Sequence, residues 1–96
     1  MSDIQELIHR RRRQVLHHSI LYYCYNVTHV ADSVFDSWAQ ELARLQVEHP
    51  AESAAVGYQL EAFQGFTGET GFHLPMHEPR ASRVARRIIA DKQAHN

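Results

Sequence analysis

The fold is set by residues 15–50, which read VLHHSILYYCYNVTHVADSVFDSWAQELARLQVEHP. This stretch begins with a segment rich in Tyr and His, passes through the polar and β-branched residues 26–29, and continues from Asp32. Beyond Asp32, apolar residues recur every three or four positions, at Phe35, Trp38, Leu42 and Leu45. That spacing predicts an amphipathic helix. The pattern as a whole indicates two helices joined by a short break.

We expect the first helix to run from Asp3 to about Tyr25 and the second from Asp32 to about Glu48. Asp32 is expected to cap the second helix, because an Asp side chain accepts hydrogen bonds from the first free backbone N–H groups. Two antiparallel helices make a helical hairpin. The inward face of the first helix is predicted to carry Ile4, Leu7, Ile8, Val15, Ser19 and Tyr22, with Leu16, Ile20 and Tyr23 beside them.

The remainder of the chain predicts two further helices. One is expected from Glu52 to Phe63, and the other from Arg80 to about Gln93 with Val84 and Ile88 facing inward. Between them, residues 65–72 hold three glycines and predict a loop. Its backbone N–H groups could bind a phosphate or a partner, although a tight connection packed by Phe66 and Phe72 is the more common role. Residues 73–79 contain two prolines and are expected to be extended.

The composition indicates one small all-α domain. The 96 residues are 44% hydrophobic with three Pro and four Gly, which favours a folded, helix-biased chain. We assign residues 1–96 to a single domain, with the hairpin at 15–50 and a helix, the Gly-rich loop and a C-terminal helix at 51–96. Because the core is thin, a homodimer contact or a ligand could add stability.

The sequence also predicts a cytoplasmic protein. The single cysteine, Cys24, excludes an internal disulfide and is consistent with a reducing compartment. The acidic start MSDIQEL lacks the features of a signal peptide, and no apolar run is long enough to span a bilayer.

Two carboxylates mark the start of the second helix. Asp32 and Asp36 are four residues apart, so they share one helix face. Such a pair can accept hydrogen bonds from ribose hydroxyls or balance a positively charged ring. The commoner role of these residue types is a cap at Asp32 and a favourable first-turn charge at Asp36.

Tyr22, Tyr23 and Tyr25 end the first helix, close to the start of the second if the hairpin closes. A phenol face attracts a cation such as a pyridinium by about 0.5–2 kcal/mol. Alternatively, one or two of these tyrosines pack on Phe35 and Trp38, which is the better explanation for Tyr25 and an equal one for Tyr22.

Several short motifs occur at specific spacings: His17-His18, Leu21-Tyr22, Asp32, Phe35-Asp36, Glu41-Leu42 and Glu48-His49-Pro50. Together they resemble the N-terminal (Ia) module of NAD-dependent bacterial DNA ligases, a small helical domain that binds the nicotinamide mononucleotide half of NAD. The resemblance implies that Tyr22 and Tyr23 stack on nicotinamide. It also implies that Asp32 and Asp36 contact the polar atoms of the ring or ribose, with Phe35 in the same site.

The chain departs from the family pattern at Tyr23, where the family has His, and at Phe35, where it has Tyr. Asn26 and Thr28 replace an Asp and a Pro of the intervening turn. Stacking is expected to survive these changes, while hydrogen bonds from an imidazole and a phenol are lost. The adenylation motif Lys-x-Asp-Gly is also missing, because the only lysine is Lys92. We therefore expect a binding module and not an enzyme, similar to short stand-alone ligase-related phage proteins.

Arg10, Arg11, Arg12 and Arg13 form a basic block that could contact a phosphate or a protein partner, with the guanidinium groups in water. A nucleic acid is a further candidate partner, but the four side chains point all around the helix, and such a block is more often a solvated face or a subunit contact. The rival function is thus a phage-type interaction module that binds or inhibits a host protein, including a defence complex. No metal is expected, because the eight histidines lack ligand spacing and Pro75 separates His73 from His77.

Overall fold

A computed structural model describes residues 2–28, 30–68, 74–75 and 78–94, with the side chains of 92–94 left out. It contains the helices α1 (Asp3–Tyr25), α2 (Asp32–Glu48), α3 (Pro50–Ala55) and α4 (Pro79–Ala94), and the described residues include no strand. The all-α class is confirmed. The bounds expected for the first two helices and for the C-terminal helix agree with α1, α2 and α4.

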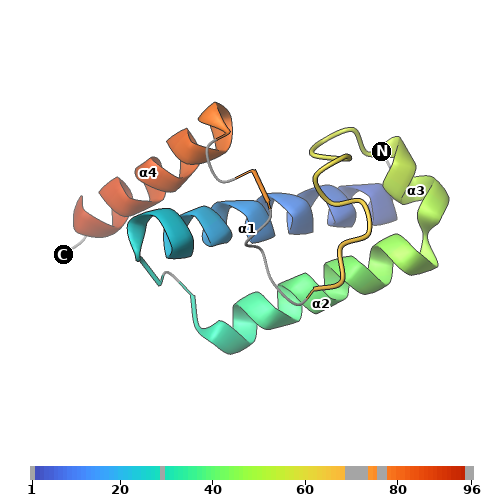
Figure 1. The fold of residues 1–96 in the computed structure, drawn as a ribbon, viewed down its shortest axis with the longest axis horizontal. Coiled ribbons are helices and arrows are strands. Elements are labelled where there is room, and N and C mark those ends of the chain that lie inside the picture. The colour runs from blue at the N-terminus through green and yellow to red at the C-terminus, as the bar shows by residue number, and fades with distance from the viewer. Residues whose placement is uncertain (1, 29, 69–73, 76–77, 95–96) are drawn as a thin grey trace.

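Helix α1 is the centre of the molecule. Figure 1 shows α2 running antiparallel along one side of α1, while α4 lies across the opposite side near the C-terminal end of α1. Helix α3 follows α2 directly and packs at the other end of the hairpin. Within the described residues, α4 packs against α1 and against no other helix. None of the described helices is both long enough and apolar enough to cross a membrane.

Both ends of α1 carry a recognisable cap. At the start, the Gln5 N–H donates to Ser2 Oγ (3.2 Å) and the Ser2 N–H donates to Gln5 Oε1 (2.9 Å), a capping box. At the end, Asn26 adopts a left-handed conformation (φ 53°) and the Val27 N–H donates to the Leu21 carbonyl (2.9 Å). These features form a Schellman-type stop. The chain therefore turns at Asn26 toward α2.

The predicted cap at Asp32 is wrong. Ala31 is the N-cap of α2, with an extended backbone (φ −61°, ψ 147°), and no side chain caps this helix end. A capping side chain must belong to the last non-helical residue. Asp32 is instead the first residue with helical geometry, so its carboxylate lies in the first turn without a capping role.

The helix predicted from Glu52 to Phe63 is also wrong, because α3 ends at Ala55 and residues 58–65 form turns. Gln59 has a positive φ of 51°, which is incompatible with a continuing helix. Phe66 is buried and makes an edge contact with Phe63, with ring centroids 5.2 Å apart. The beginning of the Gly-rich segment is therefore a packed connection, while residues 69–73 lie outside the described residues.

The core is formed between α1 and the elements around it. Leu21 is fully buried, whereas Tyr22, expected on the inward face, is 53% exposed. On α4, Ala81 and Ala85 are buried and Val84 and Ile88 only half-buried, because the small residues let α4 approach α1 closely. The buried apolar residues are Ile8, Val15, Leu16, Ile20, Leu21, Ala39, Leu42, Leu45, Val56, Phe63, Phe66, Leu74, Ala81 and Ala85.

Candidate functional site

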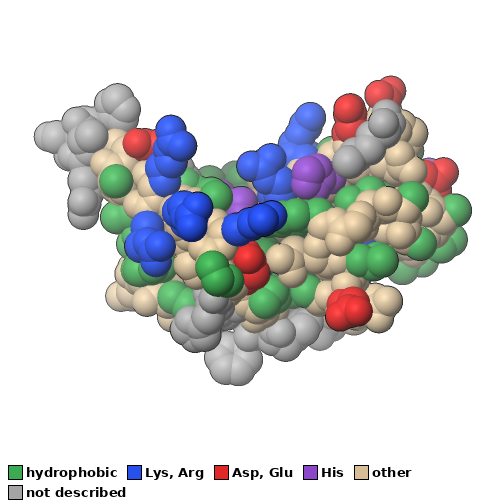
Figure 2. All heavy atoms as spheres, turned by 90° about the horizontal axis from the view of Figure 1, so that it is seen from above, with side chains coloured by type: hydrophobic (Ala, Val, Ile, Leu, Met, Phe, Trp, Pro, Cys, Tyr) green, Lys and Arg blue, Asp and Glu red, His purple; other side chains and the backbone are tan. Residues whose placement is uncertain are grey.

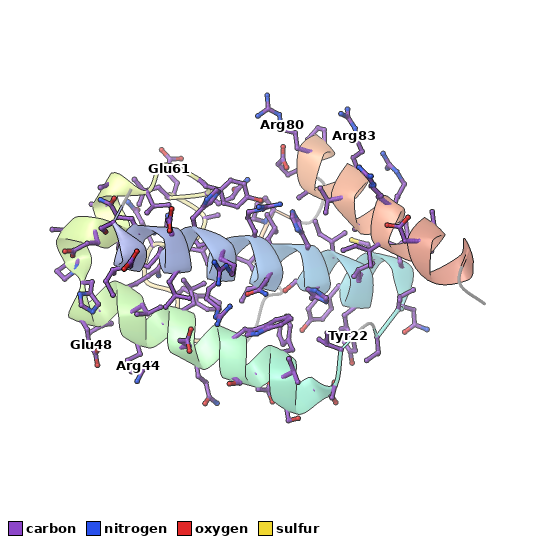
Figure 3. All side chains as sticks on the ribbon, turned by 180° about the vertical axis from the view of Figure 1, so that it is seen from behind. Tyr22, Arg44, Glu48, Glu61, Arg80 and Arg83 are labelled. Carbon is purple, nitrogen blue, oxygen red and sulfur yellow. The ribbon has the colours of Figure 1, made fainter. Side chains whose placement is uncertain are left out.

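The end of α1 and the start of α2 adjoin. The His18 and Trp38 rings lie 5.2 Å apart and fix how the two antiparallel helices face each other. Tyr22 lies one helical turn after His18 on α1, and Phe35 lies about one turn before Trp38 on α2. Because the two helices run in opposite directions, Tyr22 and Phe35 lie toward the same end of the hairpin. Figure 3 shows Tyr22 between the end of α1 and the start of α2.

The aromatic part of this site faces solvent. Tyr22 and Tyr23 are 53% and 45% exposed, and their rings meet edge to face with centroids 5.0 Å apart. Phe35 is half-buried beside the core. More than half of the Tyr22 side chain is exposed, and Tyr25, for which packing on Phe35 and Trp38 was the better explanation, is 38% exposed. About half of each phenol side chain is therefore in contact with solvent.

The acidic part of the site lies on α2. Asp32 and Asp36 are both exposed and one helical turn apart. In the described part of the chain neither carboxylate takes part in an ion pair. Together with the tyrosines, these carboxylates could hold a ring cation and the hydroxyl groups attached to it.

The arginine block does not behave as a unit. Arg12 is completely buried. It donates five hydrogen bonds, to Gln46 Oε1, to the carbonyls of Ser53, Val56 and Tyr58, and to Ser53 Oγ, at 2.7–3.0 Å. Arg11 pairs with Glu41 (Nε to Oε1, 2.8 Å). The expectation of four solvated guanidinium groups is therefore wrong, and only Arg10 and Arg13 are exposed.

A sequence signal for the burial of Arg12 did exist. Arg12 lies four residues after Ile8 and four before Leu16, so helical periodicity places it on the buried stripe of α1. Arg10, Arg11 and Arg13, its neighbours in the basic block, lie off this stripe. Adjacent residues on a helix point in different directions.

Glu78 and His17 lie where the start of α4 meets α1. The N–H groups of Ala81 (2.7 Å) and Arg80 (3.2 Å) donate to the Glu78 carboxylate, which lowers the pKa of Glu78 and caps α4. His17 is buried, and burial lowers the pKa of its imidazole; Arg13 lowers that pKa further, while Glu78 opposes the shift. These residues organise the junction of the two helices.

No described set of three or more His, Cys, Asp or Glu side chains is placed to hold a metal ion. His73 and His77, which the sequence did not favour as metal ligands, lie outside the described residues. Cys24 is exposed at the end of α1.

Comparison with known proteins identifies the family of the chain. The family model described as "DNA ligase-like, N-terminal NAD+-binding domain" matches residues 1–55, which include α1, α2 and α3. Neither a search of curated proteins nor a search of solved structures finds a match. The family match covers more than half of the 96 residues and contains every aromatic and acidic residue of the candidate site. The chain therefore belongs to the family of DNA ligase-like, N-terminal NAD+-binding domains.

Proposed function

We propose that this protein binds the nicotinamide mononucleotide portion of NAD at the junction of α1 and α2. The observation that carries the proposal is the placement of two exposed tyrosines, Tyr22 and Tyr23, at the hairpin end that also presents Asp32 and Asp36. The family to which the chain belongs supports the same ligand class.

The chemistry of the site suits the ligand. A nicotinamide ring in its oxidised form is a flat cation, and a tyrosine face attracts such a ring by about 0.5–2 kcal/mol. Asp32 and Asp36 would balance the ring charge or accept hydrogen bonds from the ribose hydroxyls. Phe35 would close the site on its apolar side without donating a hydrogen bond, since it lacks a hydroxyl group.

We further propose that the module acts by binding and performs no adenylation of its own. The chain has one lysine, Lys92, in the sequence Ala-Asp-Lys-Gln near its end. That sequence does not match the Lys-x-Asp-Gly motif. Incubation with NAD, followed by mass spectrometry of the intact protein, should give an unmodified chain; an adduct of one adenylate would overturn this part of the proposal.

Titration with nicotinamide mononucleotide followed by NMR tests the binding proposal. We expect amide shifts at the end of α1 and the start of α2, and a loss of at least about fivefold in affinity for Tyr22→Ala and Asp32→Asn, corresponding to about 1 kcal/mol. Asp3→Asn is the matched control for Asp32→Asn. Asp3 is also the first residue of a helix but lies at the opposite end of α1.

The two possible outcomes are distinct. Binding that is weakened by Asp32→Asn and unchanged by Asp3→Asn supports the site. An absence of shifts at millimolar ligand, or equal losses for both Asp variants, would refute it.

A further inference from the structure

Helix α4 presents a row of arginines to solvent. Its inward side buries Ala81 and Ala85 against α1, and its four arginines are all exposed; they are Arg80, Arg83, Arg86 and Arg87. Arg80, Arg83 and Arg87 follow the three- and four-residue spacing of a single helix face. Figure 3 shows Arg80 and Arg83 pointing away from the body of the molecule.

Helix α1 extends this basic surface. Helix α4 packs against α1, and His17, one turn after Arg13 on α1, is buried. Arg13 is exposed, and Arg10 is exposed one turn earlier on α1. Figure 2 shows arginine side chains gathered along α4 and continuing onto the neighbouring surface. We call Arg10, Arg13, Arg80, Arg83, Arg86 and Arg87 the arginine face.

Little in the described structure neutralises this face. No described carboxylate forms an ion pair with any of its arginines. The carboxylate of Glu78, two residues before Arg80, accepts hydrogen bonds from the backbone of α4. Asp91 is the one acid within α4. The chain as a whole has a net charge of −1, so the positive potential is local and does not follow from an overall excess of basic residues.

The chemistry of the face favours a phosphate polymer over a protein. A protein interface has an apolar centre, yet the large exposed apolar residues are on α1 and α2 and none is on α4; they are Tyr22, Tyr23, Tyr25, Val34 and Val47. Arginine forks match phosphate oxygens in pairs. Arg80 and Arg87 are separated by about 10 Å of helix axis, a length over which duplex DNA carries about six phosphate charges.

We propose that the arginine face binds the phosphate backbone of a nucleic acid without reading its sequence. Four of its six arginines belong to α4, which lies outside the residues 1–55 matched by the family model, so the surface is a property of this chain's own C-terminal part. The face is separate from the Tyr22–Asp32 site. Nicotinamide mononucleotide is not required for the proposed contact.

Fluorescence anisotropy with the full chain and a labelled DNA duplex of about 20 base pairs, at about 50 mM salt, tests the proposal. We expect the double variant Arg83→Gln/Arg87→Gln to bind at least about tenfold more weakly and to lower the slope of log K against log salt by about 2. The matched control is Arg44→Glu, because it changes the net charge by the same amount. Arg44 is exposed on α2, away from Arg80 and Arg83 (Figure 3).

Tyr22→Ala should leave DNA binding unchanged, which separates this proposal from nucleotide binding at the hairpin. Competition with poly-glutamate tests the alternative of an acidic protein partner. The proposal is supported if the α4 double variant loses DNA affinity while Arg44→Glu stays within about twofold of the original chain. Poly-glutamate should also compete less well than unlabelled DNA. The proposal would be overturned if the original chain did not bind DNA, or if the α4 double variant and Arg44→Glu lost equal affinity for DNA. Competition by poly-glutamate as strong as that by DNA would overturn it too.

Discussion

Arg12 Nη2 donates hydrogen bonds to both the carbonyl oxygen (3.0 Å) and the Oγ (2.9 Å) of Ser53, which joins the middle of α1 to α3. The other three N–H groups of Arg12 reach Gln46, Val56 and Tyr58, so all five guanidinium donors are used. These partners are neutral. The arginine charge is thus balanced by the carbonyl dipoles at the C-terminal end of α3. Arg12 thereby holds residues 53–58 on the hairpin.

Replacement of Arg12 should therefore destabilise the fold strongly. Arg12→Met keeps much of the side-chain volume but leaves several buried acceptors unpaired, so we expect a loss of at least about 3 kcal/mol in the free energy of unfolding. Chemical denaturation followed by circular dichroism measures this free energy of unfolding. Arg13→Met is the matched control and should change stability by less than about 0.5 kcal/mol, because Arg13 is exposed. Equal losses for the two variants would contradict this account of Arg12.

The stability of the protein should fall as the pH is lowered through 6.5. Burial, with a further contribution from Arg13, lowers the pKa of His17 below its usual 6.5. In the pH range between the folded and unfolded pKa values the unfolded chain binds the extra proton, so acid favours unfolding. Denaturation midpoints measured between about pH 7.5 and 5.5 should reveal how steeply the stability depends on pH.

His17→Gln should reduce this pH dependence, whatever it does to stability at neutral pH. His49→Gln leaves His17 in place and serves as the control, which should keep the slope. If the two variants show the same slope as the unmodified chain, His17 is not the group that couples protonation to folding.

Gly68 should resist substitution, whereas Gly57 should accept it. Gly68 has a φ of +83°, and an added Cβ would lie 3.1 Å from the Ala39 carbonyl oxygen of α2. We expect Gly68→Ala to cost at least about 1 kcal/mol, because it combines left-handed strain with this close contact. No atom lies within 4 Å of a Cβ added at Gly57. Gly57→Ala should thus be neutral or slightly stabilising in thermal unfolding, and a larger loss at Gly57 than at Gly68 would disprove the assignment.

The left-handed end of α1 should tolerate only particular residues. Asn26 has φ 53°, a conformation that glycine adopts readily and that β-branched residues avoid. Asn26→Gly should stay within about 0.5 kcal/mol of the original stability, and Asn26→Val should lose about 1–2 kcal/mol. Thr28→Val introduces the same side chain two residues later, at an exposed position, as a control. Thermal unfolding of the three variants would refute the cap if Asn26→Val and Thr28→Val behaved alike.

The sequence by itself determined the helices α1, α2 and α4 and the family of the chain. Apolar residues spaced by three and four, together with the break before Asp32 and the stop at Pro50, are local signals that arise from the helical period and from backbone geometry. The sequence was also enough to choose Tyr22, Asp32 and Asp36 as candidate site residues. The spacing of the family's motifs, on which that choice rests, is a property of the linear sequence.

Only the tertiary structure decided where the helical backbone of α2 begins and which partners the buried polar groups find. Ala31, not Asp32, is the N-cap, because Asp32 already has helical geometry in the folded chain. The helical period places Arg12 on the buried stripe of α1, but it does not show which acceptors the buried guanidinium finds. The carbonyls of Ser53, Val56 and Tyr58 accept from Arg12 across more than 40 positions of sequence, and contacts at that separation leave no local periodic signal. The helix expected after Pro50 ends at Ala55, in the segment that makes these contacts.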